Sequence, residues 1–182
     1  MDAYGKRIDP YTVQFVRLLP GPIERIWAFL WDSDKRGEWF ARGAMPTKPG
    51  EGFEMHFKHS TLSPNQAEPP ERMREMDKTG HNSRNILLAY EPPHRLVFSF
   101  GPDAREDSEV EFVLKEEGDP KNNLVRLTLT HRKIPNRKYA LDVSGGWHSH
   151  LAILQAKAEG RVPPAFWDVW RETDGVYERR YQ

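Results

Sequence analysis

The chain has 182 residues, a length that suits one domain with a hydrophobic core of its own. Its 27 basic residues balance 27 acidic ones, so no overall basic field is available to bind nucleic acid. The absence of cysteine excludes disulfides, thiol catalysis and thiolate metal sites. Residues 1–10 carry Asp2, Lys6, Arg7 and Asp9 and no apolar stretch typical of a secretory signal, and no apolar run is long enough to span a membrane. We therefore expect a cytoplasmic protein.

The N-terminal third of the chain alternates strand-like and helical patterns. Residues 12–19 are rich in Val, Phe and Leu and predict a strand, which the Pro-Gly-Pro sequence at 20–22 ends. Apolar side chains at helical spacing predict a helix over 23–30, and a second short helix or turn follows within 31–40. Residues 53–57 alternate apolar and polar side chains, which predicts a half-buried strand.

The segment 62–83 differs from its surroundings. It is rich in proline and charge and holds few large apolar side chains. We expect a long connection with one helical turn near residues 71–76. Connections of this length often serve as lids or binding loops, and disorder is the alternative.

Four strand-like runs then return at hairpin spacing. Residues 86–90, 96–100, 110–114 and 125–131 are short, rich in β-formers and separated by turn sequences. This spacing predicts an antiparallel meander. Its alternation places apolar side chains on one face, which must pack against another element.

A long amphipathic segment follows the meander. We expect Asn136 to cap a helix that runs to Glu159, with a later start at Ser144 as the alternative. The glycines at 145–146 would each cost about 1 kcal/mol relative to alanine inside this helix. Such a cost indicates a packing reason, either a close approach by another backbone or space left beside the helix. Residues 161–182 form an aromatic C-terminal extension that we expect to pack back on the body.

The order of these elements predicts an α+β fold in which a curved antiparallel sheet grips the long C-terminal helix. The motifs that carry a family resemblance lie at residues 19–27, 39–40, 49–53, 91–96, 108–110, 127–131 and 146–154. In order and spacing the chain resembles the START-like (SRPBCC) superfamily, and within it a bacterial subgroup of the branch of activators of heat-shock-protein-90 ATPase homologues. The resemblance implies one domain over residues 1–182, with a helix-grip (START, Bet v-like) fold and an internal hydrophobic cavity.

Apolar side chains of the expected sheet face, with rings and histidines of the long helix, are the candidate ligand-binding residues. They are Trp39, Phe53, Met55, Phe57, Phe98, Phe100, Phe112, Leu129, His131, Trp147, His148, His150 and Leu151.

Three histidines are the sharpest candidates for polar chemistry. His131, His148 and His150 could meet at one end of the cavity, as ligand anchors or as acid–base groups near neutral pH. The alternative is that each is a satisfied histidine at a core edge or on the surface. His148 and His150 point about 200° apart on a helix and cannot chelate one ion together. His56 and His59 are placed on opposite sides of the sheet and have no acidic partner at metal-ligand spacing, so no metal site is expected. The sequence has no P-loop and no dinucleotide-binding glycine motif, so no cofactor is expected either.

The leading hypothesis is a protein that binds or carries a small hydrophobic or aromatic molecule, or a lipid, without catalytic activity. The first alternative is a cofactor-free cyclase, aromatase or hydrolase that uses His131 or His150 as a proton shuttle. The second is a module related to co-chaperones, which would expose the aromatic side chains of residues 166–181 to a partner. The expected partner is a small apolar or aromatic molecule; a homodimer is left open, and a chaperone is the less favoured partner.

Overall fold

The computed structural model describes residues 3–101, 108–118, 123–173 and 175–182. Within these ranges, strands follow one another in a single sheet of order β1-β2-β7-β6-β5-β4-β3, and every neighbouring pair is antiparallel. The strands are β1 (Lys6–Asp9), β2 (Thr12–Pro20), β3 (Gly52–Phe57), β4 (His81–Glu91), β5 (Arg95–Phe100), β6 (Ser108–Glu117) and β7 (Leu124–Arg132).

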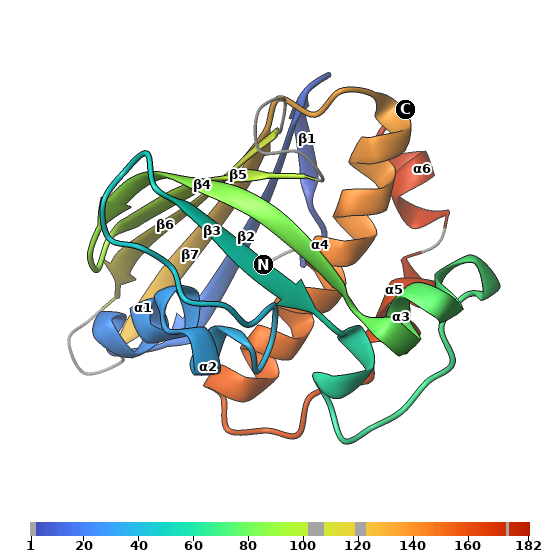
Figure 1. The fold of residues 1–182 in the computed structure, drawn as a ribbon, viewed down its shortest axis with the longest axis horizontal. Helices are drawn as coiled ribbons and strands as arrows, with labels where there is room; N and C mark the ends of the chain where they lie inside the picture. Colours follow the sequence, from blue (N-terminus) through green and yellow to red (C-terminus); the bar gives the residue numbers. More distant parts are fainter. Residues whose placement is uncertain (1–2, 102–107, 119–122, 174) are drawn as a thin grey trace.

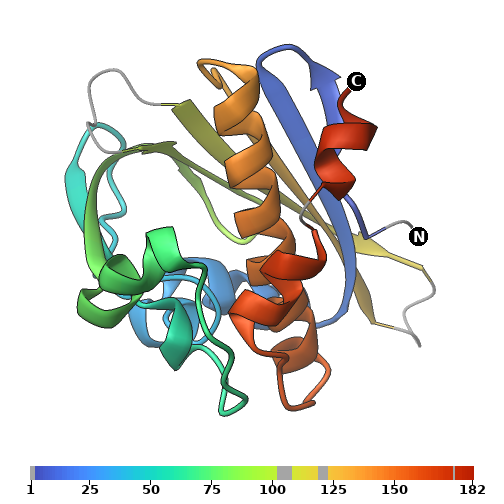
Figure 2. The same cartoon turned by 90° about the vertical axis from the view of Figure 1, so that its right-hand side faces the viewer.

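The sheet curves around one long helix (Figure 1). Helix α4 lies across the concave face, and α5 and α6 lie along its outer side (Figure 2). The helical segments are α1 (Ile23–Trp31), α2 (Ser33–Arg36), η1 (His59–Thr61), η2 (Glu71–Met73), α3 (Arg74–Thr79), α4 (Arg137–Ala158), α5 (Phe166–Glu172) and α6 (Val176–Arg180). This is the predicted α+β architecture with a helix gripped by a curved sheet. No helix among the described residues is both long enough and apolar enough to cross a bilayer.

The hydrophobic core lies between the concave face of the sheet and α4. In β2 every second side chain is buried, among them Val13, Phe15 and Leu19. The register of β6 and β7 sets Phe112 opposite Leu129, so both rows of apolar side chains point to the same face. The alternation read from the sequence is therefore the alternation that fills the core.

Helix α4 takes the longer of the two lengths considered. The side chain of Asn136 accepts a hydrogen bond from the backbone N–H of Tyr139 at 2.9 Å, which caps the helix before its first turn. The two glycines inside it have different surroundings. A Cβ at Gly145 would lie 3.0 Å from Nε1 of Trp170 on α5, whereas a Cβ at Gly146 would meet nothing within 4 Å. The first glycine allows close packing, and the second leaves space.

The sheet extends beyond the strands expected from the sequence. Strand β1 was not anticipated, and β4 begins at His81, inside the segment taken as a connection. The inward side chains at the start of β4 are Ser83 and Asn85, which are polar and give no hydrophobic alternation. They are satisfied by hydrogen bonds, since Ser83 Oγ donates to Asn85 Oδ1 at 2.8 Å and Asn85 Nδ2 donates to the carbonyl of Ser99 at 2.7 Å.

The aromatic C-terminal extension lies against the body of the protein. Phe166 and Trp167 of α5 are buried, and so are Tyr177 and Tyr181. Tyr177 Oη accepts a hydrogen bond from the backbone N–H of Gly5 at 3.0 Å, and Tyr181 lies with its hydroxyl 2.9 Å from that of a serine on α4. The first contact joins the two ends of the chain to each other, and the second joins the C-terminal end to α4.

Candidate functional site

A pocket of about 300 Å³ opens where α4 faces one edge of the sheet, at the end of β3, the start of β4 and the end of β5. The segment that carries η2 and α3 covers it from the third side and contributes two methionines. The lining residues are Phe40, Phe57, His59, Met73, Met76, His81, Phe100, Tyr139, Asp142, Val143, Gly146, Trp147 and His150.

Aromatic rings form the walls of this pocket and hold one another in place. Phe40 stacks on Trp147, with ring centroids 5.0 Å apart and planes 27° apart. Phe57 meets the edge of Phe40 at 5.0 Å, and Phe100 lies 5.6 Å from Trp147. Aromatic pairs prefer such offset and edge-to-face geometries, so these contacts stabilise the rings in the pocket wall. Gly146 adds no side chain between them, which keeps the space beside α4 open.

Three histidines from different elements meet at one end of the pocket. The ring of His59 lies 5.3 Å from that of His150 and 5.9 Å from that of His81. The antiparallel pairing of Phe57 with His81 brings the end of β3 and the start of β4 together. Sequence reasoning missed this cluster, because its members are far apart in the chain and follow no common spacing; the strand pairing was the one signal that could have joined two of them.

All three rings are uncharged at neutral pH. Burial lowers the pKa of His59 to about 4, with a smaller effect of the same sign from His81 and an opposing one from Asp77. Burial also lowers the pKa of His81, and His56 lowers it further. The pKa of His150 lies well below its usual value, first because the ring is buried and then because His59 is beside it. The pocket therefore presents imidazoles, not imidazolium ions.

The protonation pattern of His150 is fixed by the backbone. Its Nδ1 lies 2.8 Å from the carbonyl oxygen of Trp39, and because a carbonyl only accepts, Nδ1 carries the proton. In the neutral ring this leaves Nε2 with a free lone pair. His150 is consequently a hydrogen-bond acceptor in the pocket lining.

The loop that carries the Trp39 carbonyl is held by a buried arginine. Arg36 is only 1% exposed, and its guanidinium donates to the carbonyls of Trp31 at 2.8 Å, of Ala41 at 3.1 Å and of Gly43. Burial lowers the pKa of Arg36 to about 10, which leaves it charged at neutral pH.

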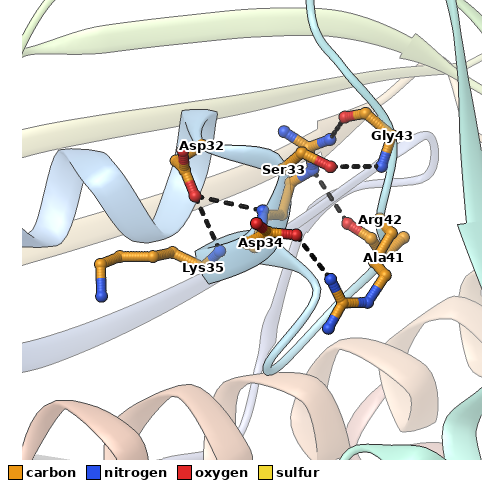
Figure 3. Close-up of polar contacts among 8 residues, drawn as sticks. Asp32, Ser33, Asp34, Lys35, Ala41, Arg42 and Gly43 are labelled. Carbon is orange, nitrogen blue, oxygen red and sulfur yellow. Dashed lines mark hydrogen bonds and ion pairs between the residues drawn. The ribbon is translucent and has the colours of Figure 1, made fainter.

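The short helix α2 braces the same loop from its exposed side. The carboxylate of Asp32 accepts from the N–H groups of Asp34 and Lys35, and Asp34 pairs with Arg42 at 2.6 Å (Figure 3). The Ser33 hydroxyl accepts from the N–H of Gly43 at 2.9 Å. With the buried guanidinium, these contacts fix the wall of the pocket that includes Phe40.

His131 lies behind the pocket wall and is fully buried. Its Nδ1 accepts from the indole N–H of Trp147 at 3.0 Å, so its Nε2 carries the proton and donates to Ser108 Oγ at 2.6 Å. That hydroxyl donates onward to the carbonyl of Phe100 at 2.6 Å. An indole stands where a Ser-His-Asp triad has its carboxylate, and burial lowers the pKa of His131 to about 3. The Ser108–His131 pair is therefore a structural link.

His148 faces away from this site. Its Nδ1 lies 3.0 Å from Tyr177 Oη, and its ring packs on Tyr4 with centroids 4.6 Å apart. The expectation that His131, His148 and His150 meet at one end of a cavity is not met. Two residues apart on a helix, His148 and His150 project to opposite sides, and Trp147 separates His131 from the pocket.

The structure brings four of the sequence-based candidates into the pocket lining, namely Phe57, Phe100, Trp147 and His150. Eight others are buried core side chains: Trp39, Phe53, Met55, Phe98, Phe112, Leu129, His131 and Leu151. The space remains at one edge, under α3, because the sheet curves away from α4 there. Across the described ranges, no group of three or more metal-ligating side chains is arranged to hold an ion.

A curved antiparallel sheet closed over a long C-terminal helix, with a pocket between them, defines an α+β protein of the helix-grip type. The sequence model described as "Activator of Hsp90 ATPase homolog 1-like protein" matches residues 20–159. The chain belongs to this family, within the SRPBCC superfamily. A comparison with curated proteins finds no match.

Solved structures share the fold over most of the chain. A protein of Bordetella parapertussis, solved by NMR in solution, is 45% identical, covers 98% of this chain and 91% of its own, and superposes with a TM-score of 0.80. CalU16 of Micromonospora echinospora is 21% identical, with a TM-score of 0.63 over 93% of this chain and 87% of its own. DynU16, from the dynemicin biosynthetic locus, is 17% identical, with a TM-score of 0.62 over 85% of this chain and 49% of its own.

Proposed function

We propose that this protein binds a small apolar or aromatic molecule in the pocket between α4, the sheet edge and α3. The observation that carries the proposal is Gly146, which lies inside α4 where glycine costs about 1 kcal/mol relative to alanine. A side chain there would meet no neighbour, yet the position faces aromatic walls. A glycine that lowers helix stability and keeps this space open is expected where a ligand fills the space.

The dimensions and chemistry of the pocket agree with this role. A volume of about 300 Å³ is at the lower end of the range for small-molecule sites, which suits a ligand of one or two fused rings. Met73 and Met76 on the covering segment are flexible side chains that adapt to ligands of different shape. Residues 62–80 would serve as a lid, since η2 and α3 within this segment supply two of the lining side chains.

Binding without turnover has more support than catalysis. The pocket histidines have a pKa well below neutrality, which makes them weak bases at neutral pH. A role as a co-chaperone-like module that acts through the aromatic C-terminal extension has less support still, because Phe166, Trp167 and Tyr177 are buried.

The test is a titration of neutral aromatic fragments, naphthalene and 2-naphthol among them, followed by amide and indole resonances. The indole N–H of Trp147 is the reporter, because the ring lines the pocket and its proton is held by His131. Gly146→Leu should fill the pocket and weaken binding at least tenfold. Ala152→Leu is the matched control, since Ala152 lies on α4 beside His148, away from the pocket.

The pattern across the variants decides the outcome. Binding retained in Gly146→Ala and Ala152→Leu but lost in Gly146→Leu would support the proposal. Fragments that leave the pocket resonances unmoved, or that bind Gly146→Leu as well as the wild type, would contradict it.

A further inference from the structure

The polar groups that line the pocket narrow the class of ligand that it can bind. Resting on the proposed binding function, we infer that the pocket selects an uncharged aromatic ligand that donates a hydrogen bond to Nε2 of His150, as a phenol does, and that it rejects anions.

The first step is the fixed orientation of His150. Its Nδ1–H is held by the Trp39 carbonyl at 2.8 Å, and the indole of Trp39 is itself fixed by a hydrogen bond to the carbonyl of Phe29 at 2.8 Å. Rotating the imidazole by 180° would break its bond to the backbone. Nε2 is therefore a preorganised acceptor, and a ligand gains from donating to it without first ordering the ring.

A second polar atom of the pocket lacks a partner. His81 lines the pocket, and its Nδ1 is buried with no hydrogen-bond partner among the described residues. Buried polar atoms in proteins are nearly always paired, so an unpaired one beside a pocket indicates a missing polar neighbour.

The charges around the pocket disfavour an anion. The lining residues within the described ranges include no lysine or arginine, and the lining carboxylate belongs to Asp142. Arg72 pairs with Asp142 at 3.5 Å on the exposed rim and stacks over Trp170, so its charge is directed away from the aromatic walls. An anionic ligand would lose its hydration without gaining a cation.

The aromatic walls supply the rest of the selectivity. His150 lies with its ring 4.9 Å from Phe40 and 4.8 Å from Phe166, in edge-on and tilted contacts that enclose it in apolar surface. A flat ring packed against the wall formed by Phe57, Phe100 and Trp147 would direct a hydroxyl substituent toward this enclosed acceptor. In such a low-polarity surrounding a hydrogen bond is stronger than in water.

The experiment compares four ligands of one ring system at pH 7: 2-naphthol, 2-methoxynaphthalene, naphthalene and 2-naphthoate. Naphthol should bind about fivefold to tenfold more tightly than its methyl ether, which has the same oxygen but no proton to donate. Naphthoate should bind more weakly than naphthalene. A methyl ether that binds as tightly as naphthol, or naphthoate as the tightest ligand, would overturn the inference.

His150→Phe provides the matched variant, because it keeps a ring and removes the acceptor. Its affinity for naphthol should fall to that for naphthalene, while its affinity for naphthalene stays within about twofold. If that variant does not fold, the ¹⁵N resonance of His150 Nε2 in the wild type replaces it: the resonance should move with naphthol and stay in place with the methyl ether.

The same series separates this inference from the binding proposal. Suppose that the wild type binds naphthalene and naphthol equally and that Gly146→Leu binds neither. This result would support the binding site and overturn the hydrogen-bond selectivity. Failure of all four ligands to bind would overturn both.

Discussion

At the scale of single residues, the core side chains could be predicted from the sequence, whereas the histidines that line the pocket could not. His131 shares the apolar face of β7, and only the structure shows that both ring nitrogens are taken by Trp147 and Ser108. His59 and His81 carry no signal in the sequence that joins them to His150, because three separate elements bring them together. Side chains far apart in the chain meet through tertiary packing, which no local pattern encodes.

The link through His131 has a measurable consequence for stability. His131→Phe would leave the buried indole N–H of Trp147 without an acceptor, and we expect a loss of about 2–3 kcal/mol in the free energy of unfolding. Urea denaturation of the purified variant measures it. The double variant His131→Phe/Trp147→Phe should lose less than the sum of the two single variants, since it removes both partners. Additive losses would show that the two rings are not coupled.

At the scale of elements, α4 was predicted with its cap and its full length, whereas the start of β4 was missed. The helix carries its own signals, namely Asn136 at the cap and apolar side chains at helical spacing. Strand β4 begins with polar inward residues whose hydrogen-bond partner is the carbonyl of Ser99 on the neighbouring strand. A short stretch of sequence contains helix caps and hydrophobic spacing, but it does not contain the hydrogen-bond partner on a neighbouring strand.

The adjacent glycines of α4 make a matched pair for testing this packing. Gly146→Ala should raise the free energy of unfolding by about 0.5–1 kcal/mol, because alanine favours the helix and its Cβ enters open space. Gly145→Ala brings the same gain in helix propensity, but its Cβ would lie 3.0 Å from Trp170 and 3.1 Å from Thr173. These neighbours would have to shift, so the gain in the free energy of unfolding should disappear. Urea titrations of both variants give the difference. Equal gains at the two sites would refute the assignment of different roles.

At the scale of the whole molecule, sequence patterns and the resemblance to a family together predicted the helix-grip architecture, but they did not locate the pocket. Some side chains of the apolar sheet face were expected to line a cavity; Phe57 and Phe100 do line the pocket, whereas the other candidates on this face are buried in the core. The open volume lies at the edge of the sheet, between α4 and the segment that carries η2 and α3. The position of a cavity depends on how closely two elements pack, and hydrophobic alternation is the same for filled and open stretches.

Burial of neutral histidines in both core and pocket makes the stability of the molecule depend on pH. The folded-state pKa is lowered for His59, His81, His131 and His150, so the unfolded chain binds more protons once the pH falls below the unfolded value near 6.5. The free energy of unfolding should be level above pH 7. It should fall as the pH drops from 6.5 toward 4, by about 2 kcal/mol at pH 5 for the fully buried His131.

Urea denaturation between pH 5 and pH 7.5 measures this dependence in a window where the histidines act nearly alone. Unfolded carboxyl groups take up protons mainly below pH 5, so their contribution within the window is small. The stability of His131→Phe should fall less steeply with acid than that of the wild type, because one proton fewer is taken up on unfolding. A wild-type stability that does not change across this window would mean that the folded and unfolded chains bind the same number of protons, so the histidines would titrate near 6.5 in the folded protein and become charged toward pH 5. A charged His150 has no lone pair to offer, so the same curve also tests the acceptor in the pocket.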